Sequence, residues 1–346
     1  LEIRMINLRN DYSQIAHPKI MKVLSDACLN ANEGYGLDES SQRAAHVIRE
    51  LLEDKSADIH FLMNGTGTNK TVLSHILRPY QAVISCDTGH INVHETGAVE
   101  ATGHKVIVCN GIDGKLDRKL VEQAFYDHTD EHMVMPKAVY ISNATETGAV
   151  YTLSELKDLR HICDKLGLYL YMDGARLGVA MQSEKNNIKW KDLSSLFDAF
   201  CIGGTKNGAM LGEAVVICNE ELKKDFRYSI KNGGGMYAKG FIIGMQFYEL
   251  FRDGLYNELA DNSNRMADML KKGLIAAGYR MEYDSYTNQL FVIINKTQVK
   301  ELSEKIIFET IREKSDKQMV IRFVTSFATK EKEIKEALRI MEELNK

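Results

Sequence analysis

Long apolar runs, prolines and a compact hydrophobic leader are scarce or missing in this chain of 346 residues. No run of 18 or more apolar residues occurs, so no membrane-spanning helix is expected. Only three prolines are present, which excludes a proline-rich linker. Residues 1–12 are charged and lack the apolar segment of a secretory signal. Met5 is a candidate natural start, with Leu1–Arg4 as an added leader.

Metal-binding cysteine pairs and a strong excess of one charge are also missing. The six cysteines form no C-x-x-C pair, and no histidine cluster accompanies them, so no metal site is expected. Several lie in apolar runs, which is typical of buried thiols in a reducing, cytoplasmic compartment. The net charge of −4 implies no basic face, so we expect no nucleic-acid partner and a small substrate instead.

What the sequence does contain is a regular alternation of short apolar runs and helical patterns between residues 40 and 220. Most of the runs are rich in Val, Ile, Tyr or Phe, which indicates strands buried on both faces of a mainly parallel sheet. Helices between the strands predict a three-layer α/β domain. The expected strands are His60–Met63, Ala82–Cys86, Lys105–Cys109, Ala138–Ser142, Leu168–Asp173, Phe200–Gly203 and Ala214–Cys218. The expected helices are Asn69–Leu77, Asn92–Ala101, Asp117–Ala124 and Ser154–Leu166.

A different pattern follows residue 220 and predicts a smaller α+β domain. We place residues 1–250 in the large domain, including the N-terminal segment 1–15, and residues 251–346 in the small one. The expected helices here are Ala238–Phe251, Tyr256–Ala277, Val299–Glu313 and Lys330–Leu344, and the expected strands are Leu290–Ile294 and Val320–Val324.

A glycine- and threonine-rich segment, Asn64-Gly65-Thr66-Gly67-Thr68-Asn69, joins a predicted strand to a predicted helix. Glycines allow an anion to approach the backbone closely, and free N–H groups at a helix start can bind a phosphate. The segment lacks the G-K-[ST] ending of a P-loop and the spacing of a dinucleotide site. An ordinary turn is the alternative interpretation.

Three polar residues follow buried strands at the edge where α/β sheets bind ligands. Asp173 ends the strand LYLYMD, where a buried carboxylate needs a partner, although it could instead cap a helix. Lys206 lies among small residues in Gly203-Gly204-Thr205-Lys206, where a desolvated amine can attack a carbonyl; a solvated loop lysine is the alternative. His90 follows AVISC and could stack on an aromatic ring or be an ordinary hydrogen-bonded histidine.

Taken in order, these segments resemble the low-specificity L-threonine aldolase family, in the aromatic amino acid β-eliminating lyase and threonine aldolase group of PLP-dependent fold type I enzymes. The most specific part is the pair DGARLG at 173–178 and IGGTKNGA at 202–209. The resemblance implies a fold type I domain with a mostly parallel seven-stranded sheet, a small C-terminal α+β domain, and pyridoxal 5′-phosphate (PLP) as cofactor. The remaining matching segments are NDY at 10–12, GYG at 34–36, GTGTN at 65–69, DTGH at 87–90, HETGA at 94–98, GGGM at 233–236, TNQ at 287–289 and IRFVTS at 321–326.

The resemblance also implies roles for individual residues. Lys206 holds the cofactor as a Schiff base, Asp173 pairs with the pyridine nitrogen, and His90 stacks on the ring. Gly65, Thr66, Gly67 and Thr205 bind the phosphate, while Asn10, Arg176 and Arg322 bind the substrate, the two arginines through its α-carboxylate. The GGGM loop contacts the cofactor phosphate of a neighbouring subunit, which implies a homodimer or homotetramer with an active site at the subunit interface.

Two positions depart from the family pattern. The family usually has a histidine after the strand Ala138–Ser142, whereas this chain reads Asn143-Ala144-Thr145-Glu146-Thr147. The family often has an arginine after GGGM, whereas Tyr237 stands there, with Lys239 as a candidate replacement.

The resulting hypothesis is a lyase that splits L-threonine or L-allo-threonine into glycine and an aldehyde. A base must take the β-hydroxyl proton, and His90 is the first choice, followed by His94 and Glu146. β-Elimination or transamination on the same scaffold is the alternative chemistry, because a fold does not determine a reaction. A PLP-binding protein without turnover is the third possibility.

Overall fold

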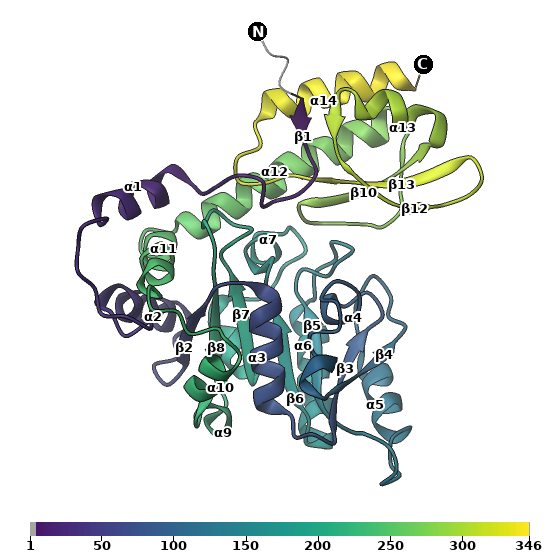
Figure 1. Cartoon of the computed structure of the whole chain (residues 1–346). Helices are drawn as coiled ribbons and strands as arrows, with labels where there is room; N and C mark the ends of the chain where they lie inside the picture. Colours follow the sequence, from purple (N-terminus) through teal and green to yellow (C-terminus); the bar gives the residue numbers. More distant parts are fainter. Residues whose placement is uncertain (1–4, 346) are drawn as a thin grey trace.

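The computed structural model describes residues 5–345, so the expectation about Leu1–Arg4 lies outside the described residues. A larger α/β part carries a smaller α+β part stacked on one end of its sheet (Figure 1). Among the described residues, no helix has both the length and the apolar character needed to span a bilayer.

Seven strands form the central sheet in the order β2-β8-β7-β6-β5-β3-β4. The five strands from β7 to β4 run parallel, and β8 runs antiparallel to both of its neighbours. The predicted mostly parallel seven-stranded sheet is therefore confirmed. In sheet order the strands are β2 (Asp58–Leu62), β8 (Glu213–Ile217), β7 (Ala199–Gly203), β6 (Tyr169–Asp173), β5 (Met135–Ser142), β3 (Gln81–Cys86) and β4 (Lys105–Cys109).

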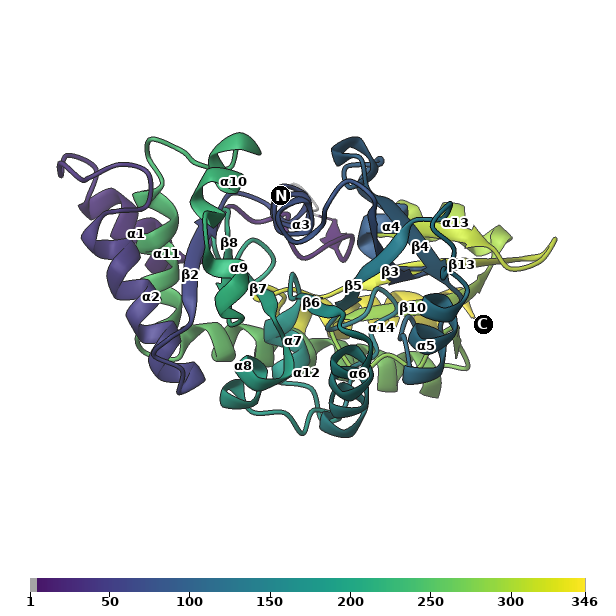
Figure 2. The ribbon, with the colours of Figure 1, turned by 90° about the horizontal axis from the view of Figure 1, so that it is seen from below.

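Helices cover both faces of this sheet, which explains why β3, β7 and β8 are buried at every position. Figure 2 shows the two helical layers on opposite sides of the strands. One layer contains α2 (Glu39–Leu52), α5 (Arg118–Tyr126), α6 (Leu153–Leu166), α7 (Leu177–Met181), α8 (Leu193–Leu196) and α11 (Phe241–Phe251), with α1 (Pro18–Asp26) packed on α11. The other contains α3 (Gly65–Ile76), α4 (His90–Val93), α9 (Glu220–Lys223) and α10 (Phe226–Asn232).

The small domain is built on a four-stranded antiparallel sheet in the order β12-β13-β10-β9. Leu8 is buried in the core of this domain, and β1 pairs in parallel with β11, so residues 6–8 pack with the small domain although the sequence analysis placed segment 1–15 in the large one. The strands are β1 (Ile6–Asn7), β9 (Arg280–Met281), β10 (Gln289–Asn295), β11 (Ile306–Ile307), β12 (Glu309–Glu313) and β13 (Gln318–Val324); the helices are α12 (Leu255–Ala276), α13 (Lys296–Ser303) and α14 (Glu331–Leu344).

One carbonyl group close to the sheet edge accepts several hydrogen bonds that connect the two domains. The Gly148 oxygen accepts a hydrogen bond from the Tyr286 backbone N–H at 3.1 Å. It also accepts from the Ser285 hydroxyl at 3.4 Å and the Thr287 hydroxyl at 3.2 Å. The small domain is thereby held over the ends of β5 and β6.

Two predicted helices and one prediction about thiols are wrong. The expected helix Asn92–Ala101 is interrupted because Thr96 and Gly97 adopt left-handed backbone conformations, with φ of 53° and 71°. The expected helix Val299–Glu313 ends at Ser303, since the following residues pair as β11 and β12. Cys28 is exposed, in contrast to the expectation of buried cysteines.

The start of α6 follows the sequence signal at Thr152. The Thr152 hydroxyl accepts from the Glu155 N–H at 3.3 Å, and the Glu155 carboxylate accepts from the Thr152 N–H at 2.7 Å. This reciprocal pair satisfies two backbone donors that a helix start otherwise leaves free.

We therefore expect Thr152→Ala to lower the free energy of unfolding by about 1 kcal/mol, the usual cost of a lost N-cap. The measurement is the urea unfolding midpoint followed by circular dichroism. Ser154→Ala, an exposed serine in the same first turn, is the matched control and should change stability by less than about 0.5 kcal/mol. Equal midpoints for the two variants would contradict the capping role.

Candidate active site

Asp173 lies at the end of β6, only 5 % exposed, and is held by three short hydrogen bonds. Asn69 Nδ2 and the Tyr140 hydroxyl each donate to Oδ2 at 2.8 Å, and the Ala175 N–H donates to Oδ1 at 2.8 Å. Burial acts to raise the pKa of Asp173, but the Asn69 amide, the His90 charge and the other donors outweigh it, and the net shift is downward. Asp173 is therefore ionised at neutral pH.

A second buried acid, Glu95, links this carboxylate to His90. Asn69 Nδ2 also donates to Glu95 Oε1 at 2.7 Å, and the same oxygen lies 2.7 Å from His90 Nδ1. One donor or acceptor atom each of His90, Glu95 and Asp173 lies within 4.8 Å of the others. Burial acts to lower the pKa of His90, but Glu95, Glu146 and Asp173 outweigh it and raise the pKa above 6.5. Nδ1 is fixed on Glu95, which leaves Nε2 to face the rest of the site.

Lys206 lies in the loop after β7, and its positive charge acts on three buried acids. Burial acts to raise the pKa of the Asp11, Asp173 and Glu213 carboxyls, and the Lys206 charge opposes this on all three. The two ends of the Lys206 loop are joined, since the Gly204 N–H donates to the Gly212 carbonyl at 3.0 Å. The structure thus brings Lys206, Asp173 and His90 to one sheet edge, as the sequence predicted.

The first turn of α3 offers donors for an anion at the same edge. The Gly67 N–H is already used, because it donates to Asn64 Oδ1 at 2.7 Å. Within the described chain, the Gly65 and Thr66 N–H groups have no hydrogen-bond acceptor. Thr68 is fully buried, and among residues 5–345 its hydroxyl has no partner. The phosphate site predicted from Gly65, Thr66 and Gly67 therefore offers two of these three amides, and the Thr68 hydroxyl is buried away from it.

Two arginines approach the site from opposite domains, in different electrostatic states. Arg176 is buried and paired with Asp11 through Nε at 2.8 Å and Nη2 at 3.0 Å. Arg322, on β13, donates from Nη1 to Gln289 Oε1 at 3.3 Å. Its Nε is buried and has no acceptor in the described part of the chain. Burial and the Arg176 charge lower the pKa of Arg322, so this guanidinium is the one short of a counter-charge.

Glu146 lies near Arg176 and the two histidines, in the segment 143–147 where the family usually has a histidine. Its carboxylate is 3.9 Å from Arg176 Nη1, and its backbone oxygen accepts from Gln289 Nε2 at 3.5 Å. Its negative charge acts to raise the pKa values of both His90 and His94. His94 as a whole residue is exposed, but its ring is partly covered by neighbouring groups. This partial burial is the largest effect on the pKa of His94, which is lowered from 6.5.

Asn10 lies outside this network. Its side-chain oxygen accepts from the Tyr12 N–H at 3.1 Å and from the Ser13 hydroxyl at 2.7 Å, which is a local turn. Its neighbour Asp11 is the residue that reaches Arg176, and Asn288 Nδ2 also donates to Asp11 at 2.9 Å. Thr205 donates weakly to the Gly212 carbonyl at 3.5 Å and accepts from the Gly212 N–H at 3.0 Å, so its hydroxyl is partly engaged.

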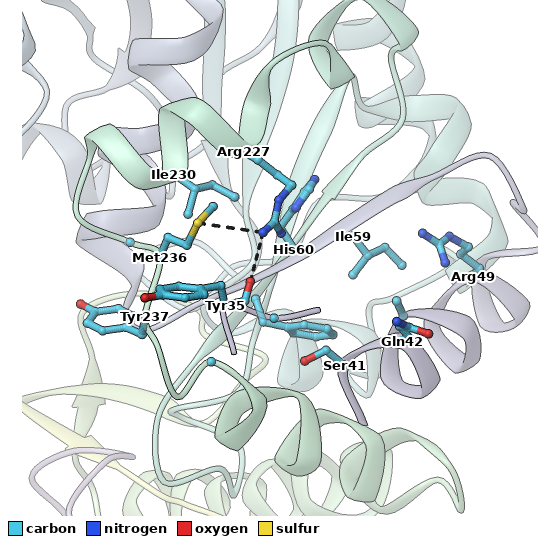
Figure 3. A pocket seen from close by; sticks show the side chains of 15 residues that line it. Tyr35, Ser41, Gln42, Arg49, Ile59, His60, Arg227, Ile230, Met236 and Tyr237 are labelled. Carbon is cyan, nitrogen blue, oxygen red and sulfur yellow. Dashed lines mark hydrogen bonds between the residues drawn. The ribbon is translucent and has the colours of Figure 1, made fainter. Parts of the chain in front are cut away.

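A separate cavity of about 330 Å³ lies between α2, β2 and the GGGM loop (Figure 3). Arg227 Nη2 crosses it and donates to the Tyr35 carbonyl at 3.2 Å, next to Met236 Sδ at 3.9 Å. Tyr237 also lines this cavity, whereas Lys206, Asp173 and His90 do not. The cavity is therefore not the predicted cofactor site.

The residues present fit PLP. Asp173 is a buried anion, which suits a protonated ring nitrogen. The Gly65 and Thr66 amides, which have no acceptor in the described chain, suit a phosphate. The Lys206 charge acts on Asp173, so the amine and the carboxylate belong to the same site.

Comparisons with known proteins agree with this geometry. The sequence model of the beta-eliminating lyase family matches residues 7–297. A low specificity L-threonine aldolase of a Pseudomonas species is 31% identical over 303 residues, covering 86% of each chain. A solved structure described as Leishmania major threonine aldolase is 44% identical, with a TM-score of 0.97 and coverage of 99% of this chain and 100% of that one. A mutant aspartate aminotransferase of Thermus thermophilus shares the fold, with a TM-score of 0.72 at 16% identity, covering 99% and 92%.

The His90–Glu95 pair generates a prediction about proton affinity. Glu95→Gln keeps the side-chain shape but removes the negative charge, so the pKa of His90 should fall. The measurement is the titration of the His90 ring by NMR. Asp130→Asn, which removes the carboxylate beside exposed His132, should leave the His90 titration unchanged. A His90 titration that is the same in Glu95→Gln and the native protein would refute the coupling.

Proposed function

We propose that this chain, which belongs to the beta-eliminating lyase family, is a PLP-dependent lyase that cleaves threonine to glycine and an aldehyde. The single observation that carries the proposal is the buried, ionised Asp173, on which the Lys206 charge acts, in the same site as the first turn of α3, whose Gly65 and Thr66 amides have no acceptor in the described chain. The similarity to threonine aldolases over most of the chain selects this reaction among those that one scaffold supports.

PLP supplies the electron sink for the carbon–carbon cleavage when it is bound, and this chain supplies its orientation and charge balance. Lys206 would be the amine that holds the cofactor. Asp173 would keep the ring nitrogen protonated, because its own pKa is lowered and it remains an anion. His90, fixed through Nδ1 on Glu95, would stack on the ring. The Gly65 and Thr66 amides would bind the phosphate.

Arg322 binds the substrate α-carboxylate. Among residues 5–345, its guanidinium has an unsatisfied buried Nε and no paired carboxylate, whereas Arg176 is already neutralised by Asp11 through two hydrogen bonds. Arg176 therefore supports the site from behind, and Arg322 is the cation left to pair with an anionic ligand. Asn10 lies in a local turn, so we do not assign it the predicted contact with substrate. Its neighbour Asp11 acts indirectly, because it supports Arg176.

Glu146 takes the proton from the substrate β-hydroxyl. It belongs to the segment 143–147, where the family usually has a histidine, and lies beside Arg176. Its charge acts to raise the pKa of both histidines, although burial leaves the pKa of His94 lowered. His90 is a weaker candidate than its place in the sequence suggested, because its raised pKa favours the protonated ring.

The protein works as a cytoplasmic homo-oligomer in this proposal. The GGGM loop, Tyr35 and Tyr237 line an open cavity away from the cofactor site of the same chain, which suits contact with a second copy. Arg227 supplies a guanidinium next to Met236, so it is a better replacement for the absent family arginine than the exposed Lys239. All six cysteines are free, as expected in a reducing compartment.

A substrate panel tests the function directly. With PLP, L-threonine should give equal amounts of glycine and acetaldehyde, and L-allo-threonine should do the same. Lys206→Ala should abolish this activity, and borohydride treatment should attach cofactor to the native protein but not to the variant. Pyruvate formed from serine, with no aldehyde from threonine, would replace the aldolase assignment by β-elimination. Cofactor fixed equally in the variant would exclude Lys206.

Arg322→Ala should raise the KM for threonine roughly 10- to 100-fold, since a lost charge-assisted hydrogen bond costs about 1.5–3 kcal/mol. Bound PLP should stay at the native level. Arg312→Ala, which removes an arginine on the neighbouring strand β12, is the matched control and should leave KM within error. A KM that does not change in Arg322→Ala would remove this residue from the substrate site.

Glu146→Gln should lower kcat by roughly 10²-fold or more, the typical contribution of a general base, because the amide keeps the shape but cannot accept a proton. PLP binding should not change. His94→Asn serves as the comparison and should lower kcat by less. If His94→Asn shows the larger loss, the base is His94 and not Glu146.

A further inference from the structure

A third buried acid, Glu213, lies at the active-site edge and has no part in the function described so far. It is the first residue of β8 and is 3% exposed. In the sheet it lies directly opposite Leu62 of β2 and Gly203 of β7. The chain leaves Leu62 toward the first turn of α3 and leaves Gly203 toward Lys206. Glu213 therefore stands between the two segments that form the anion-binding donors and the reactive amine.

The groups around Glu213 do not pair it with a fixed cation. One oxygen, Oε2, is buried without any hydrogen-bond partner in the described chain, while the Thr205 hydroxyl and the Gly204 N–H act on the carboxyl from the Lys206 loop. Lys206 is the facing cation and Asp173 the facing anion. The other titratable groups that sense its charge are Cys201 on β7 and Tyr256 at the start of α12.

Within the described part of the chain, the other elements that pack around Glu213 place uncharged residues next to it. β2 contributes Leu62, and α3 begins with the uncharged residues 65–69. On the α11 side, a Cβ added to Gly204 would come within 2.9 Å of Phe247, and one on Gly212 within 2.5 Å of Ile243. Burial is the largest influence on Glu213, and together with Asp173 it outweighs Lys206 and raises the pKa to about 8.

We propose that Glu213 is a positioning residue that works as a neutral carboxylic acid beneath the anion donors, so that losing its proton weakens the hold on a phosphate-bearing cofactor. The inference rests on the proposed binding of PLP. A phosphate dianion at the start of α3 would repel a buried carboxylate, since charges interact strongly where water is excluded. This repulsion favours the protonated acid.

Binding is consequently linked to a proton on Glu213. Below about pH 8 the acid is already neutral, and cofactor binds at no extra cost. Above that pH the empty site holds a carboxylate, which must take up a proton as the phosphate enters. The affinity for PLP should then decline as the pH rises above about 8, and this part of the decline is caused by the deprotonation of Glu213.

The experiment measures the Kd of PLP between pH 6.5 and pH 9.5, a range of about 1.5 units on either side of the pKa, in the native protein and in Glu213→Gln, whose amide imitates the neutral acid. The native Kd should grow relative to the variant by about tenfold for each pH unit above about 8, with a constant ratio below it. Glu249→Gln, a buried glutamate paired with Arg252 on α11, is the matched control and should follow the native curve. Pyridoxal, which lacks the phosphate, should show a smaller difference between native protein and Glu213→Gln.

Parallel curves for the native protein and Glu213→Gln would overturn the inference, and so would an equal effect with pyridoxal. A measurement on the native protein alone covers the case in which the variant does not fold. At pH 9, about one unit above the pKa, adding PLP should produce a new protonated-carboxyl band in the infrared difference spectrum, and its absence would overturn the inference. A native protein that binds no PLP at any pH would instead contradict the proposed function.

Discussion

The active site depends on keeping the Asp173 carboxylate charged although it is almost completely buried. Such a charge is costly in a protein interior unless hydrogen bonds and opposite charges compensate for it. Asn69, Tyr140 and the Ala175 N–H supply three hydrogen bonds, and Lys206 and His90 supply positive charge. The positions of α3, β5 and the loop after β7 all follow from this requirement, because each brings one of these groups to the end of β6.

The remaining charges are distributed so that some groups are satisfied and others are left open. Asp11 neutralises Arg176 with two short hydrogen bonds, and Glu95 fixes one nitrogen of His90. Arg322 and the first turn of α3 keep donors without acceptors among the described residues. Satisfied pairs give the site a rigid frame, and the open donors are the proposed places for a substrate carboxylate and a cofactor phosphate.

The sequence predicts the sheet and the reacting groups because both depend on local patterns. A strand buried on two faces leaves a continuous apolar run, as in AVISC or LYLYMD, and a polar residue directly after it marks the ligand edge. The supporting network has no local pattern. Asn69 reaches Asp173 across 104 residues and Arg176 reaches Asp11 across 165, and only the folded chain places them together. Glu95 was hidden by a predicted helix, which the left-handed Thr96 and Gly97 interrupt.

The Gly148 carbonyl has a consequence for how the small domain can move. Three donors from the small domain converge on this one oxygen, at 3.1, 3.4 and 3.2 Å. A rigid outward rotation of the small domain would break all three hydrogen bonds at the same time. These hydrogen bonds therefore oppose a rigid outward rotation of the small domain at the loop that follows β5.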